Sequence, residues 1–266
     1  MKRAVFFLIP FLVIVFNLNS EAQISTSQED LTKRDTLEAQ LKRAQLLTTQ
    51  SRFDEALKIY TGIIGREPDN RDAVQGWFIA KMRQTSTGGE GALKLIEDLG
   101  KSYPDNTAII FWKSFIEAET GQFEAALTDI EKLAGIFQND PLIFILKGQV
   151  LYELKRCDEA FHAFDKATLL DSERWDVWGM KALSLAKIGK FDEAIISINK
   201  GMELAPSQPA NIYNRACIYC LKGDKTNALS DLQKAISLNP AFKESARKDE
   251  DFKSLYDDED FRKITL

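Results

Sequence analysis

The chain has 266 residues, of which 44% are hydrophobic and 28% charged, and a formal net charge of −5 at pH 7. This length and apolar content are enough to bury a continuous core, and length alone indicates one or two domains. The acidic balance argues against a nucleic-acid-binding protein, which would normally carry a basic stripe. Because the three cysteines are an odd number, a scaffold built on disulfides is not expected.

The N-terminal residues 1–22 have the pattern of a secretory signal. A positively charged start precedes an apolar run over residues 4–16, and small residues two apart lead up to Ala22. The run is shorter than the ~20 residues that span a membrane comfortably. We therefore predict cleavage after Ala22 and an exported mature protein, periplasmic or secreted, without a stable membrane span; an uncleaved anchor is the alternative. The polar residues 23–36 are expected to form a flexible leader.

From residue 37 onward, one sequence pattern returns at a fixed interval. In its clearest copy, residues 189–206, a glycine permits a tight turn, acidic residues open a helix, apolar residues recur at helical spacing, and a proline ends the helix. A fixed period of this size predicts stacked repeats, each contacting mainly its neighbours. Alanines mark the equivalent place at intervals of 36, 34, 34, 34 and 34 residues: Ala56, Ala92, Ala126, Ala160, Ala194 and Ala228.

The period and the spacing of its glycine, alanine and proline resemble the tetratricopeptide repeat family. The resemblance implies an all-α fold, an α-α superhelix or solenoid of about six helix-turn-helix repeats. We divide the array, residues 37–242, into the units 37–70, 71–106, 107–140, 141–174, 175–208 and 209–242.

The last residues, 243–266, leave the repeat register. An Ala-x-x-Asp-x-x-Phe-x-x-Leu run over residues 246–255 resembles an end-of-array segment that follows some repeats of this family. We expect a short helical segment that caps the last unit. The acidic runs 249–251 and 257–260 lack the alternating ligands and central glycine of a calcium loop, so we expect a solvated helix face there.

In the register of the family, the first helices of successive units line a concave face that binds peptides or protein segments. The middle of this face is apolar and aromatic, as a binding surface requires, although some of its aromatic residues could belong to the core. It lacks the cluster of lysine and arginine with which some family members capture a peptide carboxylate. The predicted groove residues are Gln75, Ile79, Met82, Phe111, Phe115, Ile145, Gln149, Tyr152, Leu183, Tyr213, Asn214 and Cys217.

Few side chains could carry chemistry, and none is arranged as a catalytic, cofactor or metal site. His162 has no nucleophile or orienting partner nearby in the sequence. Cys217 and Cys220 form a Cys-x-x-Cys inside a helix rather than at its start, and they lack the further ligands of a zinc site, although a disulfide could form in an oxidising compartment. The glycine-rich residues 85–91 follow a helix and lack a lysine–hydroxyl pair, which indicates a lengthened turn rather than a phosphate loop.

The sequence therefore predicts a non-catalytic interaction scaffold that binds a protein or peptide segment in its groove, without a cofactor and without nucleic acid. Two alternatives remain open. One is a thiol redox factor that uses Cys217 and Cys220, and the other is a structural spacer in an envelope assembly.

Overall fold

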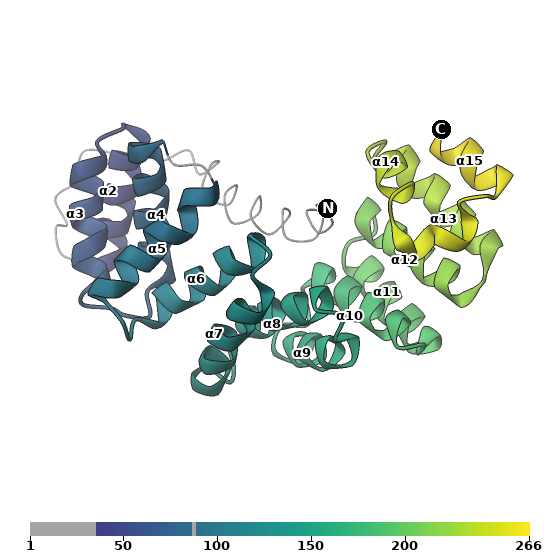
Figure 1. The fold of residues 1–266 in the computed structure, drawn as a ribbon, viewed down its shortest axis with the longest axis horizontal. Coiled ribbons are helices and arrows are strands. Elements are labelled where there is room, and N and C mark those ends of the chain that lie inside the picture. Colours follow the sequence, from purple (N-terminus) through teal and green to yellow (C-terminus); the bar gives the residue numbers. More distant parts are fainter. Residues whose placement is uncertain (1–35, 87–88) are drawn as a thin grey trace. The chain divides into compact units, whose positions relative to one another are not determined.

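A computed structural model describes residues 36–86 and 89–266, and every described element is a helix. The predicted signal, its cleavage point after Ala22 and the leader up to residue 35 lie outside the described residues. Among the residues that the structure describes, no helix is both long and apolar enough to cross a membrane. Contacts divide the chain into two compact units, residues 1–136 and 137–266, and each is described by itself (Figure 1).

The described part of unit 1 consists of helices that pack in consecutive pairs. The first helix of each pair begins at a side-chain cap: Thr36, Asn70 and Asn106 each accept the backbone N–H three residues on, at 3.2, 2.9 and 2.9 Å. Such caps satisfy N–H groups that have no partner within the helix. The elements are α2 (Leu37–Thr49), α3 (Phe53–Ile64), α4 (Arg71–Thr85), α5 (Gly89–Ser102), α6 (Thr107–Glu119) and α7 (Phe123–Ile136).

Unit 2 continues the helix pairs and ends in three short helical elements. As expected, these last elements pack against the final pair, because η2 contacts α12 while α14 and α15 contact α13. The elements are α8 (Pro141–Glu153), α9 (Cys157–Leu170), α10 (Trp175–Lys187), α11 (Phe191–Leu204), α12 (Pro209–Lys222), α13 (Lys225–Leu238), α14 (Phe242–Ala246), the 3-10 helix η2 (Glu250–Leu255) and α15 (Glu259–Thr265).

Small side chains at the helix contacts explain how the pairs close. The recurring alanines on the second helices are fully buried at 0% exposure, except Ala92 at 7%. On the first helices, Gly148 is the extreme case, because a Cβ there would lie 2.7 Å from the ring of Phe164 on α9. The predicted all-α array of helix pairs with a helical end segment is thus confirmed.

The turn inside a helix pair places one residue in the left-handed region of backbone space. In three pairs this residue is a glycine, Gly121, Gly189 or Gly223, with φ of 79°, 79° and 85°. Ser51 and Lys155 adopt the same conformation, with φ of 60° and 63°. A side chain at such a position costs free energy that glycine does not.

Candidate functional site

The predicted groove residues all lie on the first helices of their pairs, but they divide between the two units. Each unit therefore offers its own candidate surface, which we call the inner face of that unit. Unit 1 contributes Gln75, Ile79 and Met82 on α4 and Phe111 and Phe115 on α6; unit 2 contributes Ile145, Gln149 and Tyr152 on α8, Leu183 on α10, and Tyr213, Asn214 and Cys217 on α12.

In unit 1, the aromatic residues are buried. Phe111 and Phe115 are 3% and 2% exposed, and the ring of Trp112 meets both edge-on, with centroids 5.7 and 5.6 Å apart. The guanidinium of Arg71, from α4, lies 4.1 Å from the centre of the Phe111 ring. These contacts stabilise the packing of α6 on α4, as aromatic pairs and cation–π contacts do.

The more accessible predicted residues of unit 1 lie on α4. Ile79 and Met82 are half-buried, whereas Gln75 is buried and its Nε2 has no hydrogen-bond partner among the described residues. Methionine suits a surface that must adapt to a partner. Ile79 and Met82 are therefore the predicted positions of unit 1 that a partner could contact without rearranging the core.

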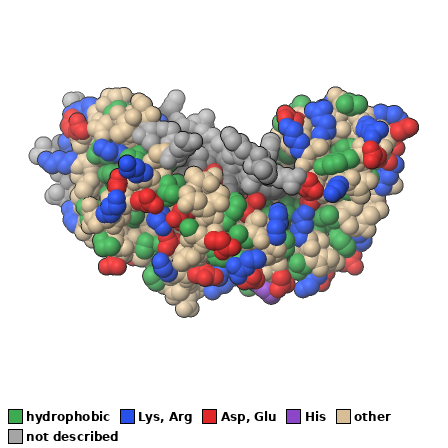
Figure 2. Space-filling view, viewed as in Figure 1, with side chains coloured by type: hydrophobic (Ala, Val, Ile, Leu, Met, Phe, Trp, Pro, Cys, Tyr) green, Lys and Arg blue, Asp and Glu red, His purple; other side chains and the backbone are tan. Residues whose placement is uncertain are grey.

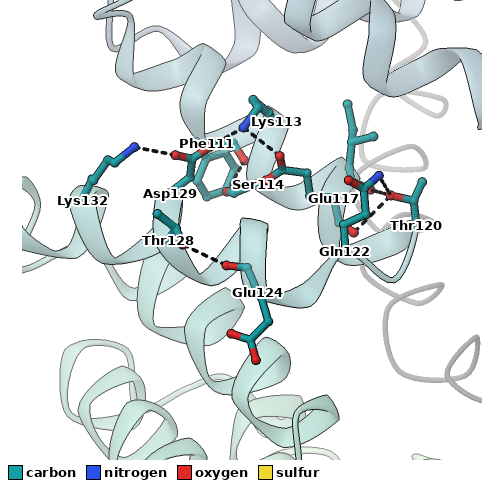
Figure 3. A network of polar contacts seen from close by, with 11 residues as sticks. Phe111, Lys113, Ser114, Glu117, Thr120, Gln122, Glu124, Thr128, Asp129 and Lys132 are labelled. Carbon is teal, nitrogen blue, oxygen red and sulfur yellow. Dashed lines mark hydrogen bonds and ion pairs between the residues drawn. The ribbon is translucent and has the colours of Figure 1, made fainter.

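A polar network joins α6 to α7 (Figure 3). The ammonium of Lys113 lies 2.7 Å from Glu117 and 2.6 Å from Asp129, and Lys132 adds a second cation 3.0 Å from Asp129. Burial works against the charged form of Asp129, but the two lysines outweigh it and lower the pKa of this carboxyl. Burial raises the pKa of Glu117 despite Lys113, and its Oε2 has no hydrogen-bond partner among the described residues. The ion pairs of Lys113 nevertheless tie α6 to α7, which indicates a structural role.

Glu119, near the end of α6, is a carboxyl without such compensation. Burial raises the pKa of Glu119 to about 7, and its buried Oε1 has no hydrogen-bond partner among the described residues. An uncompensated buried carboxylate is costly, so the protonated form is favoured in the folded state. We assign it no chemistry.

In unit 2, the chain's own end covers part of the inner face. The covering segment is residues 249–255, here called the C-terminal turn. The hydroxyl of Tyr213 donates to Oδ2 of Asp249 at 2.8 Å, and Cys217 Sγ lies 3.9 Å from the same oxygen. Lys187, the last residue of α10, forms an ion pair with Asp251. Tyr213 and Cys217 are thus in contact with a segment of the same chain.

Aromatic contacts complete this arrangement. The ring of Tyr213 stacks on Phe242 with centroids 4.5 Å apart and meets Phe252 edge-on at 5.6 Å. Phe252 is fully buried, and it also packs against Phe261 of α15 at 5.7 Å. The C-terminal turn is therefore held by apolar burial as well as by charge.

The expectation of a solvated acidic face is wrong for Asp251. Its side chain is 8% exposed, and burial together with the neighbouring Asp249 raises its pKa. Lys187 partly offsets this cost by supplying the opposite charge. The Asp-x-x-Phe spacing of residues 249–252 is the sequence signal that could have indicated the burial of Asp251. If Phe252 packs into the core, the neighbouring Asp249 and Asp251 must lie close to the core as well.

The remaining predicted residues of unit 2 are buried as well, and they are Ile145, Gln149, Tyr152, Leu183 and Asn214. Their assignment to a partner surface stays a prediction. On the face of each unit that Figure 2 shows, lysine and arginine side chains are interspersed with acidic ones. A single-sign basic stripe of the kind that binds nucleic acid does not stand out on the described part of that face.

The surroundings of the two thiols disfavour their ionised form. Burial raises the pKa of Cys217 well above its usual value, and Asp249 adds to the rise. Burial also raises the pKa of Cys220, whose Sγ lies 3.3 Å from Ser254 Oγ. Because the thiolate is the reactive form, this burial works against reactivity of both thiols.

No metal site offers an alternative within the described ranges. Residues 36–86 and 89–266 contain no cluster of three or more histidine, cysteine or acidic side chains that could hold a metal ion. His162 is exposed, and its nearest acidic atom is Oδ2 of Asp158 at 3.8 Å.

Comparison with known proteins identifies the repeat. Family models described as tetratricopeptide repeat match residues 145–209 and 210–242, all within unit 2. The chain contains tetratricopeptide repeats. Its similarity to named relatives is local. Human tetratricopeptide repeat protein 13 is 28% identical over 90 residues, which cover 34% of this chain and 10% of the relative.

A second relative, the tetratricopeptide repeat protein 36 homolog of Nematostella vectensis, is 33% identical over 69 residues, covering 26% of this chain and 38% of the relative. The chain thus spans well under half the length of both relatives.

Solved structures extend the likeness of fold to more of the chain. A chain of the APC/C hetero-tetramer Cut9–Hcn1 superimposes with a TM-score of 0.60 at 17% identity, covering 86% of this chain and 44% of that one. The crystal structure of MamA gives a TM-score of 0.52 at 18% identity, covering 62% of this chain and 96% of that one. At such identities the comparison concerns the fold alone, a solenoid of tetratricopeptide repeats.

Proposed function

We propose that this protein is a non-catalytic scaffold that binds a protein or peptide segment on the inner faces of its helix pairs. The observation that carries the proposal is the C-terminal turn of unit 2. First helices α10 and α12 hold a short segment there through Lys187 and Tyr213. An inner face that binds one segment of its own chain has the chemistry to bind a segment of another, which is how such arrays are used.

In unit 1, the proposed partner surface is centred on Ile79 and Met82. These half-buried side chains lie three positions apart on α4, so they share one face of the helix. An apolar pair of this kind provides an anchor point for an apolar side chain of a partner.

We further propose that the protein acts outside the cytoplasm, in the periplasm or as a secreted protein. The support is the sequence of residues 1–22, with its positive start, apolar run and small residues before Ala22. N-terminal sequencing of the protein from fractionated cells tests this. A chain that begins at Gln23 in the exported fraction supports the proposal, and a full-length chain confined to the cytoplasm overturns it.

The scaffold function is tested by cross-linking in intact cells, followed by purification of the tagged full chain. Proteins recovered with the wild type should be lost from the Ile79→Ser, Met82→Ser double variant. The control is Ile136→Ser, which changes an apolar side chain that is 61% exposed on the second helix α7. Identical recovery from all three proteins would favour a spacer over a partner-binding scaffold in unit 1.

The thiol redox alternative makes a different prediction. A redox factor requires a depressed thiol pKa, whereas burial raises the pKa of both Cys217 and Cys220. The full chain should therefore show no thiol-reductase activity that depends on these two cysteines. Loss of a thiol-reductase activity when both are replaced by serine would favour the redox alternative instead.

A further inference from the structure

The C-terminal turn presents a compact set of recognition groups to the inner face of unit 2. Asp249 accepts a hydrogen bond from Tyr213, Asp251 pairs with Lys187, and Phe252 packs its ring against the edge of the Tyr213 ring. The motif Asp-x-Asp-Phe thus contributes two carboxylates and one aromatic ring within four residues. The inner face contacts these groups with the hydroxyl and ring of Tyr213 and the ammonium of Lys187.

The shape of the turn is set by bonds within residues 249–256. Oδ1 of Asp249 accepts the backbone N–H of Asp251 at 3.1 Å, and the Tyr256 hydroxyl donates to the carbonyl of Asp249 at 2.8 Å. A side-chain cap of this kind fixes the start of a helical turn without help from elsewhere. The same motif in another chain could therefore present its carboxylates and ring in the same way.

We propose that Lys187, Tyr213 and Cys217 form a recognition site for a short acidic-aromatic segment, Asp-x-Asp-Phe, and that residues 249–252 are its internal ligand. A partner protein carrying the same motif takes the place of these residues. The inference rests on the proposed function, because it assumes that the inner face of unit 2 binds partners at all. It adds the chemical class of the partner segment and the residues that select it.

The internal ligand also sets how tightly a partner can bind. A segment tethered by a short linker competes at an effective concentration on the order of millimolar. The apparent affinity for a partner is reduced in proportion to the fraction of molecules whose site is open. The buried Phe252 lowers that fraction further. Loosening the C-terminal turn should therefore strengthen binding of the free motif.

The test uses a fluorescent peptide of residues 247–256 and the full chain, with fluorescence anisotropy as the readout. The loosened variant is Asp249→Asn with Asp251→Asn, which keeps an N-cap side chain but removes both charges. We expect it to bind the peptide at least about tenfold more tightly than the wild type, equivalent to one close charge pair. The control Asp257→Asn with Asp260→Asn removes the same charge outside the turn and should bind like the wild type.

A second substitution asks whether the proposed residues are the receptor. Adding Lys187→Met to the loosened variant should weaken peptide binding by about tenfold, because the ammonium that pairs with Asp251 is gone. Adding Lys225→Met instead removes a lysine that pairs with Asp258 at 2.5 Å, away from the site. That variant should keep the affinity of the loosened protein.

Charge reversal makes the test independent of how well the loosened variant folds. Lys187→Glu expels the native turn by repulsion, and it should prefer a peptide with lysine in place of Asp251 over the native peptide by about tenfold. A folded loosened variant that binds no better than the wild type, or a Lys187→Glu protein without this preference, overturns the inference. If Ile79 and Met82 still control partner recovery in that case, the proposed scaffold function stands and only this site falls.

Discussion

The close contact at Gly148 makes the packing of unit 2 testable with a single methyl group. In Gly148→Ala, the new Cβ would lie 2.7, 2.7 and 2.8 Å from Cδ1, Cε1 and Cζ of Phe164. That ring is 0% exposed, so it cannot swing into solvent. Overpacking a core costs ~1–3 kcal/mol, whereas alanine gains ~1 kcal/mol over glycine inside a helix. We expect a net loss of about 1 kcal/mol in the free energy of unfolding.

Urea unfolding followed by circular dichroism measures this loss, and the control is Gly62→Ala in α3. A Cβ at Gly62 meets no atom within 4 Å, so only the gain in helix propensity remains. Gly62→Ala should stabilise the protein by up to about 1 kcal/mol. In a double-mutant cycle, Phe164→Leu should reduce the cost of Gly148→Ala by making room for the methyl group. If Gly148→Ala stabilises the protein as Gly62→Ala does, the inference that α8 and α9 pack too closely for a methyl group at position 148 is wrong.

Other predictions use the turns, the buried carboxyl and an ion pair. Lys155 and Gly189 both have positive φ, which glycine adopts at lower cost than other residues. Lys155→Gly should therefore stabilise the protein by about 1 kcal/mol and raise the urea midpoint of unfolding, and Gly189→Ala should destabilise it by a similar amount. Glu119 has a folded pKa of about 7, raised from 4.5, so its stabilising effect is full below pH 4.5 and is lost as pH rises through 7. The wild type should therefore lose about 1 kcal/mol of unfolding free energy between pH 5 and pH 8, after discounting for partial exposure. Glu119→Gln should remove this loss, as urea unfolding curves at the two pH values would show. Asp231→Asn should lower the melting temperature, costing about 2 kcal/mol, because the amide removes the negative charge and one of the two oxygens that accept hydrogen bonds from Arg215 at 2.7 and 3.0 Å.

The helix pairs could be predicted because their determinants are local and recur. Each alanine of the repeat occupies the same tight contact, so the 34-residue interval alone predicts where the second helices pack. Gly148 carried the same information, because a glycine inside a helix has a cost that only a close neighbour explains. The structure supplies that neighbour as the ring of Phe164.

The groove residues were harder to predict because helical spacing does not distinguish residues that line the groove from residues that are buried between helices. In a stacked array, a first helix contacts its own partner and also the first helix of the next pair. Phe111 occupies an inner position in the sequence register, yet it lies under Arg71 and beside Trp112. Side-chain volume decides such cases, since a large ring on a first helix can reach the neighbouring pair.

The contacts of the C-terminal turn were beyond sequence reasoning for another reason. Lys187 and Asp251 are 64 residues apart, a separation that matches neither a helical period nor the interval of the repeat. Residues 249–251 look like a solvated acidic run when they are read by composition alone. Only the fold brings a lysine at the end of α10 to them.

An open array of repeats has to cover the exposed end of its last pair, and here the cover also reaches the inner face. α14 and α15 pack on α13, while η2 packs on α12, the helix that carries Tyr213 and Cys217. The C-terminal residues therefore both cap the last helix pair and occupy the inner face of unit 2. Any change that frees the inner face of unit 2 must also uncover apolar surface, Phe252 above all. A partner that replaces the turn must consequently supply an aromatic side chain of its own, since carboxylates alone would leave that surface exposed to water.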